Sequence, residues 1–257
     1  MKRTHGMQAG LMVVLASLVA SCEQPRMQCT AGHGGFAATY TLKPGSKQGE
    51  GDCDALRGET IGLEKYNPSR PDNEKEQDLS RALLAIRATE LGALAAEAEG
   101  AGVSIDGGAV TSMGEFASVE PDESDVCTVA SLSVAELDLP AFGDRPATRL
   151  RYAWSNVRVH VTPTFPGTLM TADLTYTKDG CTASYSVVGL WPSVSCAAPP
   201  MEGSDEIVTD PGLCDPQADI AAGRLTGSGI NPDLEEQVTC DPEIALCVLK
   251  EPPQALR

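Results

Sequence analysis

Histidine, aromatic and basic residues are scarce in this chain, and each shortage excludes a class of function. Three histidines among 257 residues leave the commonest general base and zinc ligand in short supply. Aromatic residues make up 4% of the chain, too few for an extensive carbohydrate-stacking surface. Lys and Arg total 19 against 36 Asp and Glu, so the formal net charge is −17. Such an acidic surface does not attract phosphate backbones, and we expect no nucleic acid among the partners.

The usual signatures of metal and nucleotide sites are also missing. No two cysteines form a Cys-x-x-Cys pair, and His33 and His160 lie too far apart for a zinc-binding spacing. The acidic residues at 120–125 and 205–219 could offer oxygen ligands to calcium, but neither segment has the pattern of an EF-hand loop. No glycine-rich phosphate-binding motif follows a strand. We therefore predict no metal and no cofactor.

No residue set predicts catalysis. Ser228 stands between two glycines but lacks the Gly-x-Ser-x-Gly frame of a nucleophile elbow, so we interpret it as part of a polar turn. His5 is removed if the N-terminal segment is a leader, and His33 and His160 are interpreted as surface histidines. We predict no catalytic residue and favour a non-enzymatic role. Enzymatic activity is the alternative.

The N-terminus has the order of a secretory signal peptide. Lys2 and Arg3 precede an apolar run at residues 11–19, and Ala20 and Ser21 stand before Cys22. The run is shorter than the about 20 residues that span a bilayer. The quartet Val-Ala-Ser-Cys at 19–22 resembles the lipobox of bacterial lipoproteins, although leucine is more usual at its first position. The resemblance implies cleavage after residue 21 and acylation of Cys22, and it covers only residues 1–22.

The same resemblance implies a location in the cell envelope. Acyl chains on Cys22 attach the protein to a membrane, and three of them make the anchor effectively permanent. Glu23, rather than aspartate, follows the cysteine, which implies sorting to the outer membrane. The rest of the chain resembles no characterised family and is similar only to uncharacterised predicted lipoproteins of Gram-negative bacteria.

The number of cysteines agrees with lipid attachment and with an oxidising compartment. Without Cys22, an even number remains, as disulfide bonds require. The eight disulfide candidates are Cys29, Cys53, Cys127, Cys181, Cys196, Cys214, Cys240 and Cys247. Eight cysteines allow 105 pairings. The sequence does not select one of them, and our only specific expectation is a local Cys29–Cys53 bond.

Alternating apolar and polar residues predict a mainly β fold. Strict alternation at 35–43 predicts a half-buried strand, and a second strand is expected at 59–66. The charged residues 69–78 are interpreted as an exposed loop. Shorter strands are expected at 110–118 and 127–132.

Residues 79–99 are ambiguous between a strand followed by a helix and one continuous helix. The apolar run Ala-Leu-Leu-Ala-Ile suits a buried strand, and we divide the segment into a strand at 80–87 and a helix at 89–99. Thr89 is the expected N-cap, and Gly100 is expected to end the helix.

The clearest pattern lies between residues 148 and 191 and predicts a three-stranded antiparallel meander. Apolar residues alternate on both sides of Lys178-Asp179-Gly180, which predicts a β-hairpin with an Asp-Gly turn. Before it the apolar positions change parity near Ser155 and Asn156, which predicts a β-bulge. Arg158 and His160 are then expected to point outward.

After residue 192 the chain is rich in Pro, Gly, Asp and Cys and has little periodicity. We expect disulfide bonds to take the place of a core there. The predicted fold is therefore an antiparallel sandwich or partly open barrel with one short helix and an irregular disulfide-bonded C-terminal region. The predicted organisation is a signal peptide at 1–21, a lipid-anchored β-rich domain at 22–192 and an extension at 193–257 packed on it.

Three functions remain compatible with this pattern. The first is a lipid-anchored envelope lipoprotein with a binding or structural role, whose partners are the membrane and an unknown envelope protein or ligand. The second is a periplasmic or surface hydrolase with paired carboxylates, which requires a cleft in which two carboxylates face each other. The third is a carrier of a hydrophobic ligand, which requires an apolar cavity inside the sheet.

Overall fold

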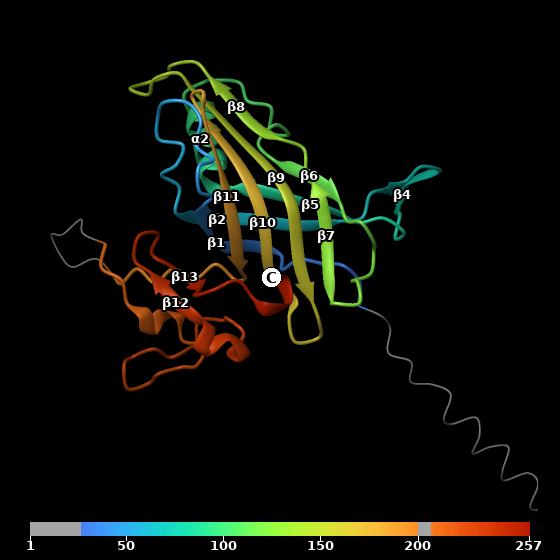
Figure 1. Cartoon of the computed structure of the whole chain (residues 1–257), viewed down its shortest axis with the longest axis vertical. Coiled ribbons are helices and arrows are strands. Elements are labelled where there is room, and N and C mark those ends of the chain that lie inside the picture. The colour runs from blue at the N-terminus through green and yellow to red at the C-terminus, as the bar shows by residue number, and fades with distance from the viewer. Residues whose placement is uncertain (1–26, 200–206) are drawn as a thin grey trace, which may run out of the picture.

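The computed structural model describes residues 27–199 and 207–257, so the predicted signal peptide and Cys22 lie outside the described residues. A nine-stranded antiparallel sheet has the strand order β6-β5-β2-β1-β11-β10-β9-β7, with β8 paired to β9 (Figure 1). Its strands are β1 Gly34–Leu42, β2 Gly58–Tyr66, β5 Leu83–Ala88, β6 Ser112–Glu115, β7 Val126–Ser131, β8 Ala135–Leu139, β9 Thr148–Val161, β10 Pro166–Lys178 and β11 Cys181–Leu190.

The sheet curves until its first and last strands meet. Ala117 N donates to Thr128 O and Ser133 N donates to Met113 O, each over 2.8 Å, so hydrogen bonds join the edges of β6 and β7. A Cβ at Gly114 would lie 2.6 Å from the carbonyl oxygen of Ser131, which shows how close the two strands are. The sheet is therefore a nearly closed barrel, and the predicted mainly β fold with a partly open barrel is confirmed.

The predicted meander is formed by β9, β10 and β11. Asp179 and Gly180 have φ angles of 50° and 88°, as a two-residue hairpin turn between twisted strands requires. The predicted bulge is also present, because the register between β9 and β10 shifts beside Asn156, whose φ is 49°. The bulge keeps both halves of β9 facing the core.

The interior of the barrel is filled by side chains. Four of the five tyrosines and Trp154 point into it, although aromatic residues are scarce in the chain as a whole. The fully buried residues among them are Tyr152, Trp154, Tyr176 and Tyr185. Helix α2, Thr89–Gly100, adds Leu91, Ala95 and Ala98 to the same core. A filled interior removes the main structural argument for a carrier of hydrophobic ligands.

The segment 79–100 divides into a strand and a helix as predicted, but two local expectations were wrong. The strand β5 begins at Leu83 rather than at residue 80. Thr89 is not the N-cap: Ala88 occupies that position, and the Thr89 hydroxyl donates to Thr60 O over 2.5 Å. The Glu59 carboxylate accepts from Glu90 N over 2.8 Å instead, so a residue from β2 satisfies the start of the helix.

Other boundaries also differ from the sequence patterns. The exposed residues 69–78 form a small hairpin, β3 Ser69–Arg70 and β4 Asn73–Gln77, which projects from the barrel rather than forming an irregular loop (Figure 1). The strand expected at 110–118 is limited to β6. Strand β8 was not predicted.

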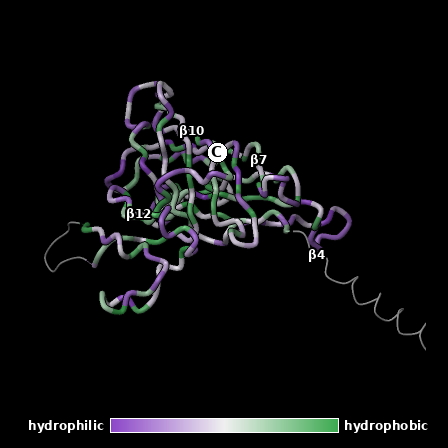
Figure 2. Tube along the Cα trace, turned by 60° about the horizontal axis from the view of Figure 1, so that its bottom comes forward, coloured by the Kyte–Doolittle hydropathy of each residue, from purple (hydrophilic) through white to green (hydrophobic). Residues whose placement is uncertain are grey.

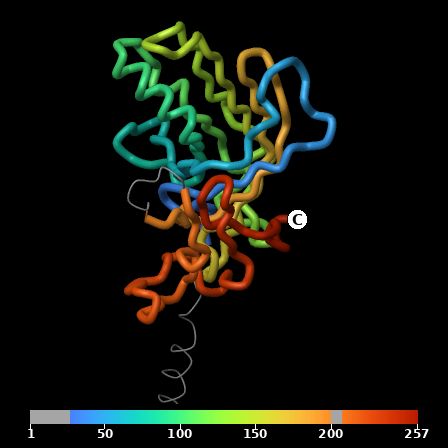
Figure 3. Tube along the Cα trace, turned by 90° about the vertical axis from the view of Figure 1, so that its left-hand side faces the viewer, coloured from blue at the N-terminus to red at the C-terminus, as the bar shows by residue number. Residues whose placement is uncertain are grey.

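The C-terminal extension packs against one end of the barrel, on the opposite side from α2 (Figures 1 and 3). It contains a hairpin, β12 Val238–Asp241 and β13 Leu246–Leu249, and three short 3-10 helices, η1 Pro211–Cys214, η2 Pro232–Gln237 and η3 Gln254–Leu256. The expectation that disulfide bonds replace a core was wrong. Leu169 and Leu190 on the outer face of the barrel pack with Leu234, Leu249 and other buried residues of the extension.

All eight predicted cysteines form disulfide bonds. The pairs are Cys29–Cys127, Cys53–Cys181, Cys196–Cys240 and Cys214–Cys247. The expected local Cys29–Cys53 bond is therefore wrong. Cys29 N donates to Val119 O, which holds Cys29 near β7, whereas the Tyr185 hydroxyl donates to Cys53 O and holds Cys53 near β11. Tertiary contacts thus outweigh closeness in sequence.

Candidate functional site

Two carboxylates meet at the α2 end of the barrel, as the hydrolase hypothesis requires. The Tyr152 hydroxyl lies 3.1 Å from Glu59 Oε1 and 2.9 Å from Glu90 Oε2. The Tyr40 hydroxyl donates to the same Glu59 oxygen over 3.1 Å. Glu59 comes from the inward face of β2 and Glu90 from the first turn of α2, so the cluster connects the helix to the sheet.

Burial controls the ionisation of this cluster. Desolvation raises the pKa of the Glu59 carboxyl, and the charge of Glu90 raises it further, while hydrogen bonds from Glu90 N, Tyr40 and Tyr152 oppose the shift. Desolvation and the two carboxylates also raise the pKa of the Tyr152 hydroxyl, which therefore remains a donor.

The carboxylate pair lies apart from the described pockets. Neither Glu59 nor Glu90 lines the pockets beside His160, Arg70, Arg224 or Asn156. The meeting of two carboxylates satisfies one part of the requirement for a hydrolase, but none of these pockets supplies the cleft. The hydrogen bonds instead join α2 to the barrel.

A pocket lies between the outer face of the barrel and the extension. His160 of β9, Phe165 of the following turn and Leu169 of β10 form one wall. Leu234 and the segments around Lys250 and Arg257 form the other. The space measures about 640 Å³, a size typical of small-ligand pockets.

His160 is the unusual polar group in this pocket. Its Nδ1 is buried and has no hydrogen-bond partner in the described structure. Desolvation lowers the pKa of the imidazole, against a smaller opposite effect of Asp125, so the ring is neutral at pH 7. The Phe165 ring lies 5.8 Å away, centroid to centroid. A neutral imidazole of this kind can give or accept one hydrogen bond with a ligand.

The charged groups of the pocket are held by local contacts. Lys250 Nζ donates to Glu236 O over 2.8 Å, and Arg257 Nη2 lies 2.5 Å from Glu251 Oε2. The pocket therefore presents apolar side chains and one imidazole, and the side-chain charges of its lining residues sum to zero.

The two histidines differ from each other more than the sequence indicates. His33 is exposed and contacts the Glu64 carboxylate, as expected of a surface histidine. His160 points outward from the barrel as predicted, but the extension covers it, so its interpretation as a simple surface residue was incomplete. Local sequence could not show this, because the covering residues lie at 234–257.

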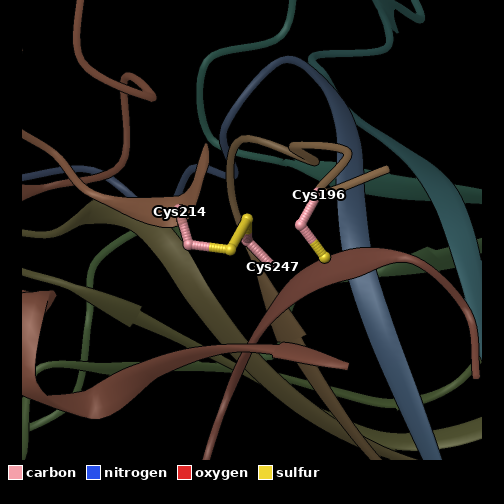
Figure 4. A group of neighbouring side chains, drawn as sticks. All are labelled: Cys196, Cys214 and Cys247. Atoms are coloured by element: carbon pink, nitrogen blue, oxygen red, sulfur yellow. A yellow bond between two sulfur atoms is a disulfide. The ribbon is translucent and has the colours of Figure 1, made fainter. Parts of the chain in front are cut away.

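Three cysteine sulfurs gather in the extension, but they do not form a metal site. The Sγ atoms of Cys196, Cys214 and Cys247 lie within 4.8 Å of one another (Figure 4). Cys214 and Cys247 are bonded to each other and Cys196 is bonded to Cys240, so none is a free thiolate. The nearby Ser228 hydroxyl donates to Cys214 O over 3.2 Å, in agreement with a polar turn.

The described residues form a nearly closed antiparallel barrel with a disulfide-bonded C-terminal extension. None of the helices in the described parts of the chain could span a membrane. The model of the MlpA family matches residues 34–192, from the start of β1 to just beyond β11. A protein of Myxococcus xanthus called "Putative lipoprotein MlpA" is 30% identical over 242 residues, which cover 91% of this chain and 89% of the relative. No solved structure matches.

The chain therefore belongs to the MlpA family. The predicted resemblance to lipoproteins without a characterised role is confirmed at this level. The family match ends where the barrel ends, so the pocket beside His160 is formed by one wall within the matched region and one wall outside it.

Proposed function

We propose that this protein is a lipid-anchored lipoprotein of the outer membrane that binds a ligand or partner in the pocket beside His160. The observation that carries the binding role is a pocket of about 640 Å³ in which His160 and apolar side chains of the barrel face the extension. A pocket of this size lined by apolar side chains and a few polar groups is typical of a ligand site. Glu59 lines none of the described pockets, which favours this role over hydrolysis.

The anchoring role is supported by the sequence before the described residues. Apolar residues 11–19 and the quartet ending in Cys22 have the order of a lipoprotein signal, and a relative over 91% of the chain is called a lipoprotein. Glu23 favours the outer membrane. Cys22 is the attachment residue in this proposal, and the remaining eight cysteines are already paired with one another.

Intact mass tests the anchor directly. The full chain is expressed in a Gram-negative host, extracted from membranes, and weighed before and after reduction and alkylation. We expect a chain that begins at Cys22, carries acyl mass and gains eight alkyl groups only after reduction. The Cys22→Ala variant should lack the acyl mass and leave the membrane fraction. An unacylated wild-type chain would contradict the anchor.

A photo-crosslinking side chain at position 254 tests the pocket, because Gln254 lines it and lies on its exposed rim. In the intact envelope we expect a discrete adduct, which His160→Phe should reduce by about tenfold through loss of one hydrogen bond between the imidazole and the occupant of the pocket. The matched control is the same side chain at the exposed Glu99 of α2, where no adduct is expected. An adduct insensitive to His160→Phe would reject the pocket as a binding site.

A further inference from the structure

The C-terminal extension carries an exposed apolar loop at residues 219–225. The side chains of Ile220 and Leu225 are 68% and 75% exposed, more than most large apolar residues in the described parts of the chain. Ala221 and Ala222, between them, are also exposed. Figure 2 shows this loop projecting from the extension with a hydrophobic tip. Exposed apolar residues that gather on one protrusion are typical of an interaction surface.

Hydrogen bonds between Asp219 and Arg224, which form the base of the loop, hold it in one conformation. Asp219 and Arg224 exchange backbone hydrogen bonds of 2.9 and 2.8 Å, and Gly223 turns the chain with a φ of 77°. The Asp219 carboxylate also accepts from Ala222 N over 3.0 Å. Because these bonds already order the backbone, binding through the tip loses little conformational entropy.

The charges at the base of the loop neutralise each other. Arg224 Nη2 lies 3.1 Å from Asp219 Oδ2 and 3.2 Å from Asp215 Oδ2, and the four residues 220–223 are uncharged. The tip can therefore enter an apolar environment while its only ion pairs stay at the base, in contact with water.

The position of the loop relative to the chain start indicates what the tip meets. Figures 1 and 3 show the extension and the start of the described chain on the side of the barrel away from α2. Met27 lies five positions after Cys22, and five residue steps span at most about 18 Å. An acylated Cys22 therefore keeps this side of the protein close to the bilayer.

We propose that the apolar loop inserts Ile220 and Leu225 into the lipid interface of the membrane that holds Cys22. The inference rests on the proposed lipid anchor and adds a second, non-covalent membrane contact, which fixes the orientation of the barrel. The lipid class it fits is zwitterionic, because a net charge of −17 disfavours anionic headgroups. The α2 end of the barrel then points away from the membrane.

Tryptophan quenching by brominated lipid tests the insertion. The acylated full chain carrying Ile220→Trp is reconstituted in phosphatidylcholine vesicles with brominated acyl chains. The native tryptophans are the buried Trp154 and the partly buried Trp191, and their background is measured on the parent chain in the same vesicles. Because interfacial segments sit about 5 to 10 Å into the headgroup and acyl boundary, we expect the added emission to fall by about half. Leu225→Trp should behave in the same way and provides a second reporter.

Val134→Trp is the matched control, because Val134 is 40% exposed just before β8, at the α2 end of the barrel. Its emission should be unaffected by bromine. If both loop reporters remain unquenched while intact mass shows acylated Cys22, the loop does not enter lipid and the inference is overturned, although the anchor stands. If the acyl mass is absent, the anchor and the inference fail together.

Discussion

Replacing Cys53 and Cys181 together by serine is expected to lower the free energy of unfolding by about 4 to 5 kcal/mol. The bond joins residues 128 positions apart, and its loss releases a long loop in the unfolded chain. It also fixes the segment before β2 to the first residue of β11. Urea denaturation under non-reducing conditions measures the loss.

The double replacement of Cys214 and Cys247 is the matched comparison. These residues are 33 positions apart, so the same chain-entropy argument gives a smaller loss of about 3 to 4 kcal/mol. An equal or larger loss in the extension than in the barrel would show that native packing, rather than loop closure, sets the contribution of these bonds.

Trp154→Ala is expected to cost about 3 to 5 kcal/mol and to open a cavity inside the barrel. Trp154 is fully enclosed, and its ring lies near those of Tyr40 and Tyr152, with centroids 6.3 and 6.2 Å away. Small apolar molecules enter dry cavities of this kind. Benzene should therefore raise the melting temperature of the variant and leave that of the wild type unchanged.

Trp191→Phe serves as the control for this variant. Trp191 is only partly buried and lies beyond β11, where its Nε1 donates to His33 O over 3.0 Å. Its replacement removes one hydrogen bond, and a loss of about 1 kcal/mol without benzene binding is expected. Stabilisation of the wild type by benzene would mean that the barrel interior admits apolar ligands, and would restore the carrier hypothesis.

The sequence predicted the parts of the fold in which local pattern and tertiary packing agree. Apolar and polar residues alternate along strands β9 to β11. The apolar positions change parity at Ser155 and Asn156, and this change predicts the bulge from sequence alone. The helix start was misassigned because the group that caps it, the Glu59 carboxylate, comes from another strand. Strand β8 was missed because only its pairing with β9 defines it.

The candidate site was less predictable than the fold. His160 was correctly placed on the outer face of β9, but the residues that cover it follow more than 70 positions later. Glu59 and Glu90 were not distinguished from the many other acidic residues, because nothing local shows that Tyr152 lies between them. The prediction of a site whose residues come from distant segments of the chain requires the tertiary structure.

The interleaved pairing of Cys29 with Cys127 and of Cys53 with Cys181 has a consequence for biogenesis. A chain that is threaded across a membrane from its N-terminus delivers Cys29 and Cys53 to the oxidising side together, well before Cys127 and Cys181. Oxidation in order of arrival would join the first two, which the native barrel keeps apart. Under that order of arrival, the native pairs form only if oxidation is delayed or if early bonds are reshuffled by thiol–disulfide exchange.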